Sequence, residues 1–299
     1  MKMPASLMKG DKIGILSTAR KISLEEIQPA IEVLKSWGLE VVTGNSIGAE
    51  SFQFAGDDEL RKNDLQEMLD DDSVKAVLFA RGGYGTVRII DELDFRKFQK
   101  QPKWLCGFSD ITVIHSHLLS VYHLPSIHCL MGISFPTATS ESIESFRKIL
   151  FGEKLSYEIP SNELNHAGAA TGILFGGNLS LLYSLLGSDS DLNTESKILF
   201  LEEIDEHLYH VDRMMMALKR AGKLENLAGL VVGHFTEMKN KDESNPFGKN
   251  AYEIISEHVS EYGYPVCFGF PAGHEPDNRA LVMGINWKLK IADKVRLVM

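Results

Sequence analysis

The sequence has little of what marks secreted, membrane-spanning or disulfide-rich proteins. It contains only three cysteines, Cys106, Cys129 and Cys267, which lack metal-type spacing and stand among apolar residues; this pattern excludes a disulfide scaffold and indicates reduced core thiols. No apolar run approaches the ~18 residues of a membrane span, and the first residues lack the apolar core of a signal peptide. We therefore expect a cytoplasmic protein.

The sequence also lacks an excess of basic residues. Lys and Arg number 31 against 41 Asp and Glu, which gives a formal net charge of -10. Such a chain has no surplus cations to displace counterions from phosphates, so general nucleic-acid binding is disfavoured and a small molecule or peptide is the expected ligand. The 299 residues are enough for two domains of about 150 residues each.

The first half alternates apolar strands with amphipathic helices. A strand is predicted within Lys12–Arg20, a helix begins after the capping-box residue Ser23, and a second strand covers Leu39–Val42. Pro29 interrupts the helical stripe and allows a start as late as the proline itself, or a kink there. A strand-helix-strand unit of about 30 residues favours a right-handed crossover between parallel strands.

The fold class that follows is α/β with two domains. Residues 1–151 are predicted to form a parallel-sheet domain of the Rossmann or flavodoxin type, and the polar, turn-rich residues 152–171 a linker. Residues 172–299 are predicted to form a mixed α/β domain, which opens with a strand, a glycine turn and a helix and ends in an antiparallel hairpin over 287–298. Within it, Met214–Met216 is interpreted as core filling.

The stretch Trp104–Leu118 carries the first candidate site residue. A buried strand ends near Cys106 and helical spacing begins at Asp110, so a tight turn must present Ser109 at the edge of the sheet, with the Asp110 amide facing an anion. This is the geometry of a nucleophile. The alternative is that Ser109 only caps the helix, because serine and aspartate are both common caps.

A glycine-rich segment, Arg81–Gly85, follows the apolar strand Ala76–Ala80. Glycines at a strand end allow backbone amides to face a ligand, and ligand sites gather at the carboxyl ends of parallel strands. The segment lacks the Walker lysine and the dinucleotide spacing. The alternative is a tight turn that leads into a helix over Thr86–Leu93.

A serine nucleophile needs a base and an orienting acid. His274 is the best candidate base, because it stands in a loop of small and turn residues after a buried strand. Glu202 fits the acid at the end of an apolar strand, although a solvated loop carboxylate is the alternative. His207 and His210 have the spacing of a metal pair but no third and fourth ligand nearby, which disfavours zinc.

Short motifs spread over nearly the whole chain resemble the LD-carboxypeptidases, a family of serine peptidases that includes the microcin C self-immunity proteins. The motifs are Gly10–Ile15, Phe54–Glu59, Ala80–Gly85, Gly107–Asp110, Gly176–Leu179, Leu199–Glu202, Asp212–Arg213 and Gly269–His274. Each is modest alone, and their order and spacing together are specific. The turn at Ser109 has Ile111 where the hydrolase elbow has a second glycine.

The resemblance implies a Ser-His-Glu triad in which Ser109 matches the nucleophile, His274 the base and Glu202 the acid. Glu203 stands beside the acid, so an assignment shifted by one residue stays open. The implied activity is release of the terminal D-alanine from murein tetrapeptides, without metal or cofactor, by a cytoplasmic homodimer of cell-wall recycling.

Further site residues are expected around this triad. The backbone amides of Gly83 and Asp110 are expected to hold the oxyanion, and Arg81 and Arg279 are candidate ligands of the substrate carboxylate.

Two other functions stay open. A microcin-type hydrolase of peptidyl nucleotides would share the triad and is expected to carry a longer insertion with an aromatic residue that stacks on the base; we find none in this chain, which has three tryptophans. A non-catalytic binding protein with the same sheet would keep its activity without the Ser109 hydroxyl.

Overall fold

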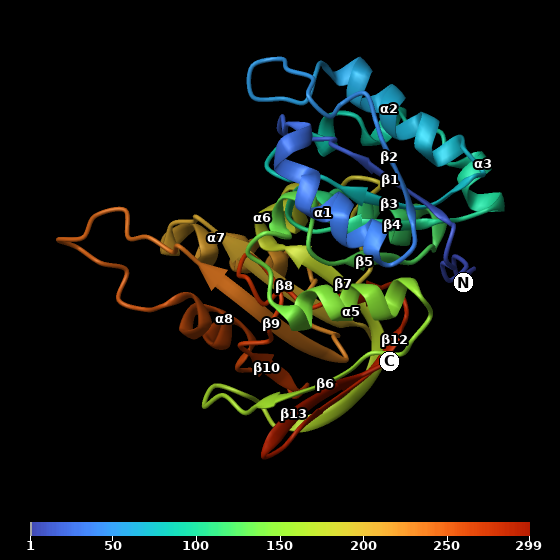
Figure 1. Ribbon diagram of the computed structural model, residues 1–299. Coiled ribbons are helices and arrows are strands. Elements are labelled where there is room, and N and C mark those ends of the chain that lie inside the picture. The colour runs from blue at the N-terminus through green and yellow to red at the C-terminus, as the bar shows by residue number, and fades with distance from the viewer. Residues whose placement is uncertain (1) are drawn as a thin grey trace.

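The apolar stretches of the first half form a mostly parallel sheet (Figure 1). In the computed structural model, which describes residues 2–299, the strand order is β11-β5-β4-β3-β1-β2, with β11 antiparallel at one edge. The strands are β1 (Lys12–Leu16), β2 (Glu40–Thr43), β3 (Val74–Phe79), β4 (Trp104–Gly107), β5 (Ser126–His128) and β11 (Leu281–Met283). The order β2-β1-β3-β4-β5 is flavodoxin-like, which confirms the predicted class.

Helices cover this sheet and connect its strands. They are α1 (Leu24–Ser36), α2 (Asp58–Asp70), α3 (Arg96–Lys100), α4 (Thr112–His117) and α5 (Ser140–Leu150). The capping box of α1 is confirmed, because the Glu26 N–H donates to Ser23 Oγ and the Ser23 N–H donates to the Glu26 carboxylate. The possible later start of this helix, at Pro29, is wrong. The capped first turn fixes the start of α1 at Leu24, and the helix continues through the proline.

The helix predicted over Thr86–Leu93 is also wrong. This segment consists of two 3₁₀ turns, η1 (Thr86–Arg88) and η2 (Ile90–Glu92). The Thr86 N–H donates to the side chain of Asp110, at 2.8 Å, so a tertiary contact fixes the first turn in place of a continuous helix.

The second half forms a sheet in the order β10-β9-β8-β7-β12-β13-β6. Its strands are β6 (Ser156–Pro160), β7 (Gly168–Asn178), β8 (Ile198–Ile204), β9 (Gly229–Thr236), β10 (Val266–Phe268), β12 (Asn286–Ile291) and β13 (Lys294–Val298). Strands β7 to β10 pair in parallel, whereas β12, β13 and β6 pair antiparallel at the bottom of Figure 1. The predicted hairpin is therefore confirmed.

Three helices pack on the second sheet: α6 (Leu179–Ser184), α7 (Leu208–Arg220) and α8 (Ala251–Val259). The core role predicted for the methionines of α7 holds for Met214 and Met215, which are buried. It is wrong for Met216, which is 43% exposed because it lies on the outer face of the helix.

The segment 152–171 contains more structure than the predicted linker. Strand β6 lies within it, with Tyr157 and Ile159 buried in alternation, and β7 begins at Gly168. An alternation this short gave no detectable period in the sequence. The proposed boundaries at 151 and 172 stay predictions. Strand β11, from the second half, pairs with β5 of the first sheet, so the two halves share a sheet edge.

The glycine turn predicted after the start of β7 is wrong. Gly176 and Gly177 continue the strand, at φ 124° and 143°. A Cβ on Gly176 would lie 2.0 Å from the carbonyl oxygen of Phe200, and one on Gly177 would lie 2.4 Å from Thr112 Oγ1. The glycines therefore allow β7 to approach both β8 and the start of α4, which brings the two halves together.

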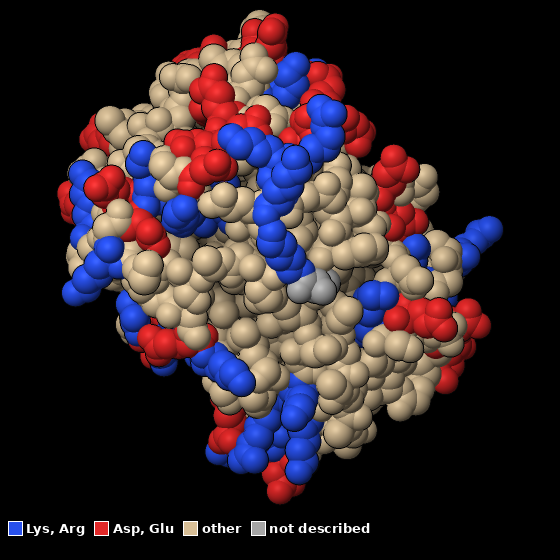
Figure 2. All heavy atoms as spheres, turned by 90° about the vertical axis from the view of Figure 1, so that its right-hand side faces the viewer, with Lys and Arg blue, Asp and Glu red and all other residues tan. Residues whose placement is uncertain are grey.

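The surface agrees with the absence of a basic excess. On the face that Figure 2 shows, acidic and basic side chains are interspersed, and a line of basic side chains runs down to an uncharged area at the middle of the face. No helix within residues 2–299 combines the length and the apolar character needed to cross a membrane. The three cysteines are buried and free.

Candidate active site

The predicted turn at Ser109 is confirmed. Strand β4 ends at Gly107, Ser109 begins the 3₁₀ turn η3 (Ser109–Ile111), and α4 follows. Ser109 has a φ of 60°, a conformation that costs a residue with a Cβ about 1–2 kcal/mol. Its side chain is partly exposed. A strained serine between a parallel strand and a helix has the placement of a hydrolase nucleophile.

The glycine-rich segment lies directly against this turn. A Cβ added to Gly82 would lie 3.0 Å from both Cβ and Oγ of Ser109. The Asp110 carboxylate accepts the Thr86 N–H and so connects the two segments. Burial raises the pKa of Asp110 to about 6, although the bond from Thr86 opposes the shift. The two strand ends therefore meet, as their order in a parallel sheet predicts.

Two backbone amides beside Ser109 are free to bind a ligand. Within residues 2–299, neither the Gly83 N–H nor the Asp110 N–H donates a hydrogen bond to another protein group. Gly83 has a φ of 112°, which favours glycine. Their role as oxyanion donors stays a prediction.

Glu202 and His274 form a hydrogen-bonded pair. Glu202 lies in β8 with no exposed surface, and His274 lies in the loop after β10. His274 Nδ1 donates to Glu202 Oε2 at 2.7 Å. This bond fixes the tautomer and leaves Nε2 as the nitrogen that can accept a proton. Gly273 makes the contact possible, because a Cβ there would lie 3.0 Å from Glu202 Cβ.

The neighbouring carboxylate, Glu203, has different partners. It accepts hydrogen bonds from Asn178 Nδ2 at 2.6 Å, from the Ser180 N–H at 2.7 Å and from the Ile204 N–H at 2.9 Å. The geometry therefore favours Glu202 over Glu203 as the partner of His274. Burial, assisted by the charge of Glu202, raises the pKa of Glu203 to about 7.

The environment of His274 sets its basicity. Burial disfavours the imidazolium, but the charge of Glu202 and the hydrogen bond to it outweigh burial, so the pKa of His274 is raised above its ordinary value. A base of this kind holds a proton more readily than a free imidazole does.

The structure brings the serine turn and the acid–base pair into one crevice. The ring of Phe108, the residue before Ser109, lies 4.7 Å from the His274 ring between centroids. No hydrogen bond joins Ser109 to His274 in the part of the chain that the structure describes; such bonds are often long in enzymes without substrate. A pocket of about 280 Å³ opens beside the base, lined among others by Phe108, Ile133, Thr137, His274 and Asn278. We call it the His274 pocket.

The two arginines predicted to bind the substrate carboxylate do not line the His274 pocket. Arg81 lies 3.9 Å from Glu26 in a separate pocket, and Arg279 forms two hydrogen bonds with Asp277, at 3.0 and 2.9 Å. Their role stays a prediction, and this geometry does not favour it. Sequence reasoning could not rank them without knowing which carboxylates each arginine pairs with.

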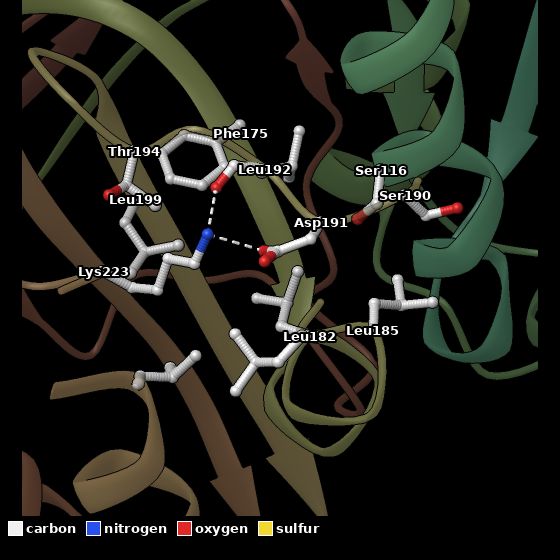
Figure 3. A pocket seen from close by; sticks show the side chains of 12 residues that line it. Ser116, Phe175, Leu182, Leu185, Ser190, Asp191, Leu192, Thr194, Leu199 and Lys223 are labelled. Carbon is white, nitrogen blue, oxygen red and sulfur yellow. Dashed lines mark hydrogen bonds and ion pairs between the residues drawn. The ribbon is translucent and has the colours of Figure 1, made fainter. Parts of the chain in front are cut away.

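A second, small pocket of about 20 Å³ lies beside Ser116 of α4 (Figure 3). Half of the residues that line it are leucines, and Lys223 forms an ion pair with Asp191 there, at 2.7 Å. No member of the predicted triad lines it, so we do not assign it to catalysis.

Of the two histidines with metal-pair spacing, His210 bonds to Glu206 at 2.6 Å, and residues 2–299 contain no group of three or more potential ligands suited to a metal ion.

Comparisons with known proteins agree with this architecture. Residues 13–129 match the LD-carboxypeptidase N-terminal domain and residues 171–289 the C-terminal domain. The chain is 34% identical to the probable murein peptide carboxypeptidase of Bacillus subtilis, over 99% of this chain and 93% of that protein.

Two solved structures resemble the whole chain. The muramoyltetrapeptide carboxypeptidase of Oxalobacter formigenes superposes with a TM-score of 0.87 at 32% identity, over 96% of this chain and 98% of that one. The microcin C7 self immunity protein MccF superposes with a TM-score of 0.90 at 20% identity, over 100% and 98% of the two chains, which shows a shared fold. The resemblance seen in the short motifs is thus confirmed, and the chain belongs to the LD-carboxypeptidase family of peptidases.

Proposed function

We propose that this protein is a serine carboxypeptidase that releases the terminal D-alanine of murein tetrapeptides by cutting the L,D bond. The observation that carries the proposal is the 2.7 Å bond between His274 and the buried Glu202, beside the strained turn of Ser109. The names of the relatives in Bacillus subtilis and Oxalobacter formigenes support this substrate class.

The reaction begins with a proton transfer. His274 Nε2 accepts the proton of Ser109 Oγ while the oxygen attacks the scissile carbonyl. The amides of Gly83 and Asp110 stabilise the oxyanion of the tetrahedral intermediate. His274 then gives its proton to the amine of D-alanine, which leaves. Water, deprotonated by the same imidazole, hydrolyses the acyl-enzyme and restores the serine.

Glu202 acts through the base. Its carboxylate accepts the Nδ1–H bond, holds the ring with Nε2 toward the crevice and stabilises the imidazolium that each proton transfer forms. Because the carboxylate is fully buried, water screens this interaction little.

Purified protein with murein tetrapeptide tests the proposal, with D-alanine release as the measurement. The wild type should release D-alanine, and Ser109→Ala should slow release by about 10⁴-fold or more. Ser116→Ala is the matched control, because Ser116 lies on α4 and its hydroxyl forms no hydrogen bond within residues 2–299. Release by Ser109→Ala at the wild-type rate would exclude the serine mechanism.

The two alternative functions are outcomes of the same assay. A microcin-type enzyme would cleave a peptidyl nucleotide and leave the tetrapeptide intact. A binding protein would cleave neither and would bind its ligand equally well with alanine at position 109.

This proposal also includes the cytoplasmic location, the role in cell-wall recycling and the homodimer that the resemblance implies. The free buried cysteines are compatible with a reducing compartment.

A further inference from the structure

A buried histidine, His128, touches the segments that carry all three members of the proposed triad. It ends β5 and has no exposed surface. Its ring lies 5.7 Å from Phe108, which precedes Ser109, and 4.9 Å from Phe200, which lies two residues before Glu202. Its Nε2 lies 3.2 Å from Oδ1 of Asn278, in the loop of His274.

The side chain of Asn278 is fixed in one orientation. Its Oδ1 also accepts the N–H of Gly273, at 3.0 Å, and Gly273 directly precedes the base. The side-chain atom of Asn278 that faces Gly273 must therefore be the oxygen, because an NH₂ group there would face the Gly273 N–H, which is itself a donor. It follows that His128 carries its proton on Nε2 and donates to Asn278.

His128 keeps this state over the working range of pH. Burial, with a smaller effect of the nearby His115, lowers the pKa of His128 well below its ordinary value, so the ring is neutral. The backbone around the contact is anchored as well. His128 pairs with Leu281 between β5 and β11, and the Asn278 N–H donates to Ser142 Oγ on α5 at 2.7 Å.

We propose that His128 and Asn278 are positioning residues, whose hydrogen bond holds the His274 loop against the sheet that carries Ser109. This inference rests on the proposed serine mechanism. The nucleophile follows β4 of the first sheet, whereas the base lies in the loop that leads from β10 of the second sheet to β11 of the first, so their distance depends on how this loop docks. The bond from His128 to Asn278, continued by the bond from Gly273, connects the first sheet to the backbone beside the base.

The expected size of the loss in rate follows from geometry. A displacement of about 1 Å between reacting groups can cost on the order of 10²-fold in rate. A loss of packing alone would lower stability and leave kcat unchanged, whereas a loss of positioning lowers kcat with little effect on KM.

Three variants and one control test the proposal. His128→Gln keeps an N–H donor at similar reach, His128→Phe removes it, and Asn278→Ala removes the acceptor from the surface of the His274 pocket. His258→Phe is the control, since His258 is also a buried histidine with a side-chain hydrogen bond, to Asp212 at 2.8 Å, but lies on α8.

Two rates are measured on protein whose circular dichroism matches the wild type. One is D-alanine release. The other is labelling of Ser109 by a fluorophosphonate probe, in which an Oγ–P bond forms, the P–F bond breaks, fluoride leaves and His274 takes the serine proton. The second rate does not depend on the natural substrate.

We expect His128→Phe and Asn278→Ala to lower both kcat and the labelling rate by about 10- to 100-fold, with KM within about threefold of the wild type. His128→Gln should recover most of the rate, and His258→Phe should match the wild type. If His128→Phe does not fold, Asn278→Ala and His128→Gln decide the question.

Wild-type rates in His128→Phe and Asn278→Ala would overturn the proposal, as would a loss in His128→Gln equal to that in His128→Phe. A wild-type protein that reacts with the probe but releases no D-alanine would contradict only the murein substrate, and the labelling rates would still test the positioning role. A wild-type protein that does neither would overturn both.

Discussion

The two sides of the crevice hold their reactive groups by different means. On the first sheet, backbone geometry presents Ser109, at a φ of 60° between β4 and α4 and packed against Gly82. On the second sheet, a side-chain bond holds His274 to the buried carboxylate of Glu202. Changes on the serine side should therefore alter reactivity and strain, whereas changes on the acid–base side should alter the titration of the base.

The largest predicted effect comes from changing one residue on each side of the crevice. Ser109→Ala and His274→Ala should each lower kcat by about 10⁴-fold or more, and the double variant should be no slower than either single one, because the residues act as one unit. The three kcat values for D-alanine release check this. Losses that multiply in the double variant would mean that the two groups act independently.

Glu202→Gln should separate the acid–base side from the serine side. Removing the buried charge should lower kcat by about 10³- to 10⁴-fold, since the ring loses its fixed tautomer. The base must be neutral to act, so kcat/KM rises as pH passes the pKa of His274, which Glu202 keeps above its ordinary value. Without that carboxylate the midpoint should move to lower pH.

A pH profile of kcat/KM measures this midpoint. Glu225→Gln, which removes an exposed carboxylate, is the control and should leave it in place. A midpoint that does not move, or that moves to higher pH, in Glu202→Gln would contradict the assigned role.

Gly177→Ala tests the contact that brings the two sides together. The added Cβ would lie 2.4 Å from Thr112 Oγ1, at a φ of 143°. We expect a loss of about 2–3 kcal/mol in the free energy of unfolding, measured by urea denaturation, because a tight contact must open. Gly187→Ala is the control, since φ there is 80° but no atom lies within 4 Å. An equal loss in both variants would leave only backbone strain as the cause.

The smallest predicted effect is the strain at the nucleophile. Ser109→Gly and Ser109→Ala both lack the hydroxyl and should be inactive, but glycine tolerates a φ of 60°. Ser109→Gly should therefore unfold with a free energy about 0.5–1 kcal/mol larger than Ser109→Ala, the relief of strain being partly offset by the greater entropy of unfolded glycine. An alanine variant more stable than the glycine variant would show that the turn is not strained.

Much of the fold could be predicted, because local signals and topology agreed. The capping box at Ser23, the buried strand β3 and the hairpin of β12 and β13 each have a pattern that a few neighbouring residues determine. The turn at Ser109 was predictable for the same reason, since an apolar strand meets a helical spacing there.

The failures have a common physical cause, which is that distant contacts decided the outcome. Gly176 and Gly177 have the composition of a turn, but they are glycines because Phe200 and Thr112 approach them. Residues 86–93 do not form one helix, because the side chain of Asp110 holds the Thr86 amide.

The candidate site was predictable only in part. The position of His274 after a buried strand indicated it, whereas for Glu202, which lies within β8, a solvated loop carboxylate stayed open and only the resemblance to the family implied its role. His128 could not be found in this way, because in the sequence it is an ordinary histidine of an apolar stretch. Its partners, Phe108, Phe200 and Asn278, come from three remote segments.

The central claim is that Ser109 carries the acyl group during turnover, and rapid acid quenching followed by peptide mass spectrometry tests it most directly. Protein quenched during hydrolysis of murein tetrapeptide should carry the tripeptide acyl group on the peptide that contains Ser109, and the adduct should be absent from Ser109→Ala. An adduct on another residue, or undiminished D-alanine release by Ser109→Ala, would contradict the account.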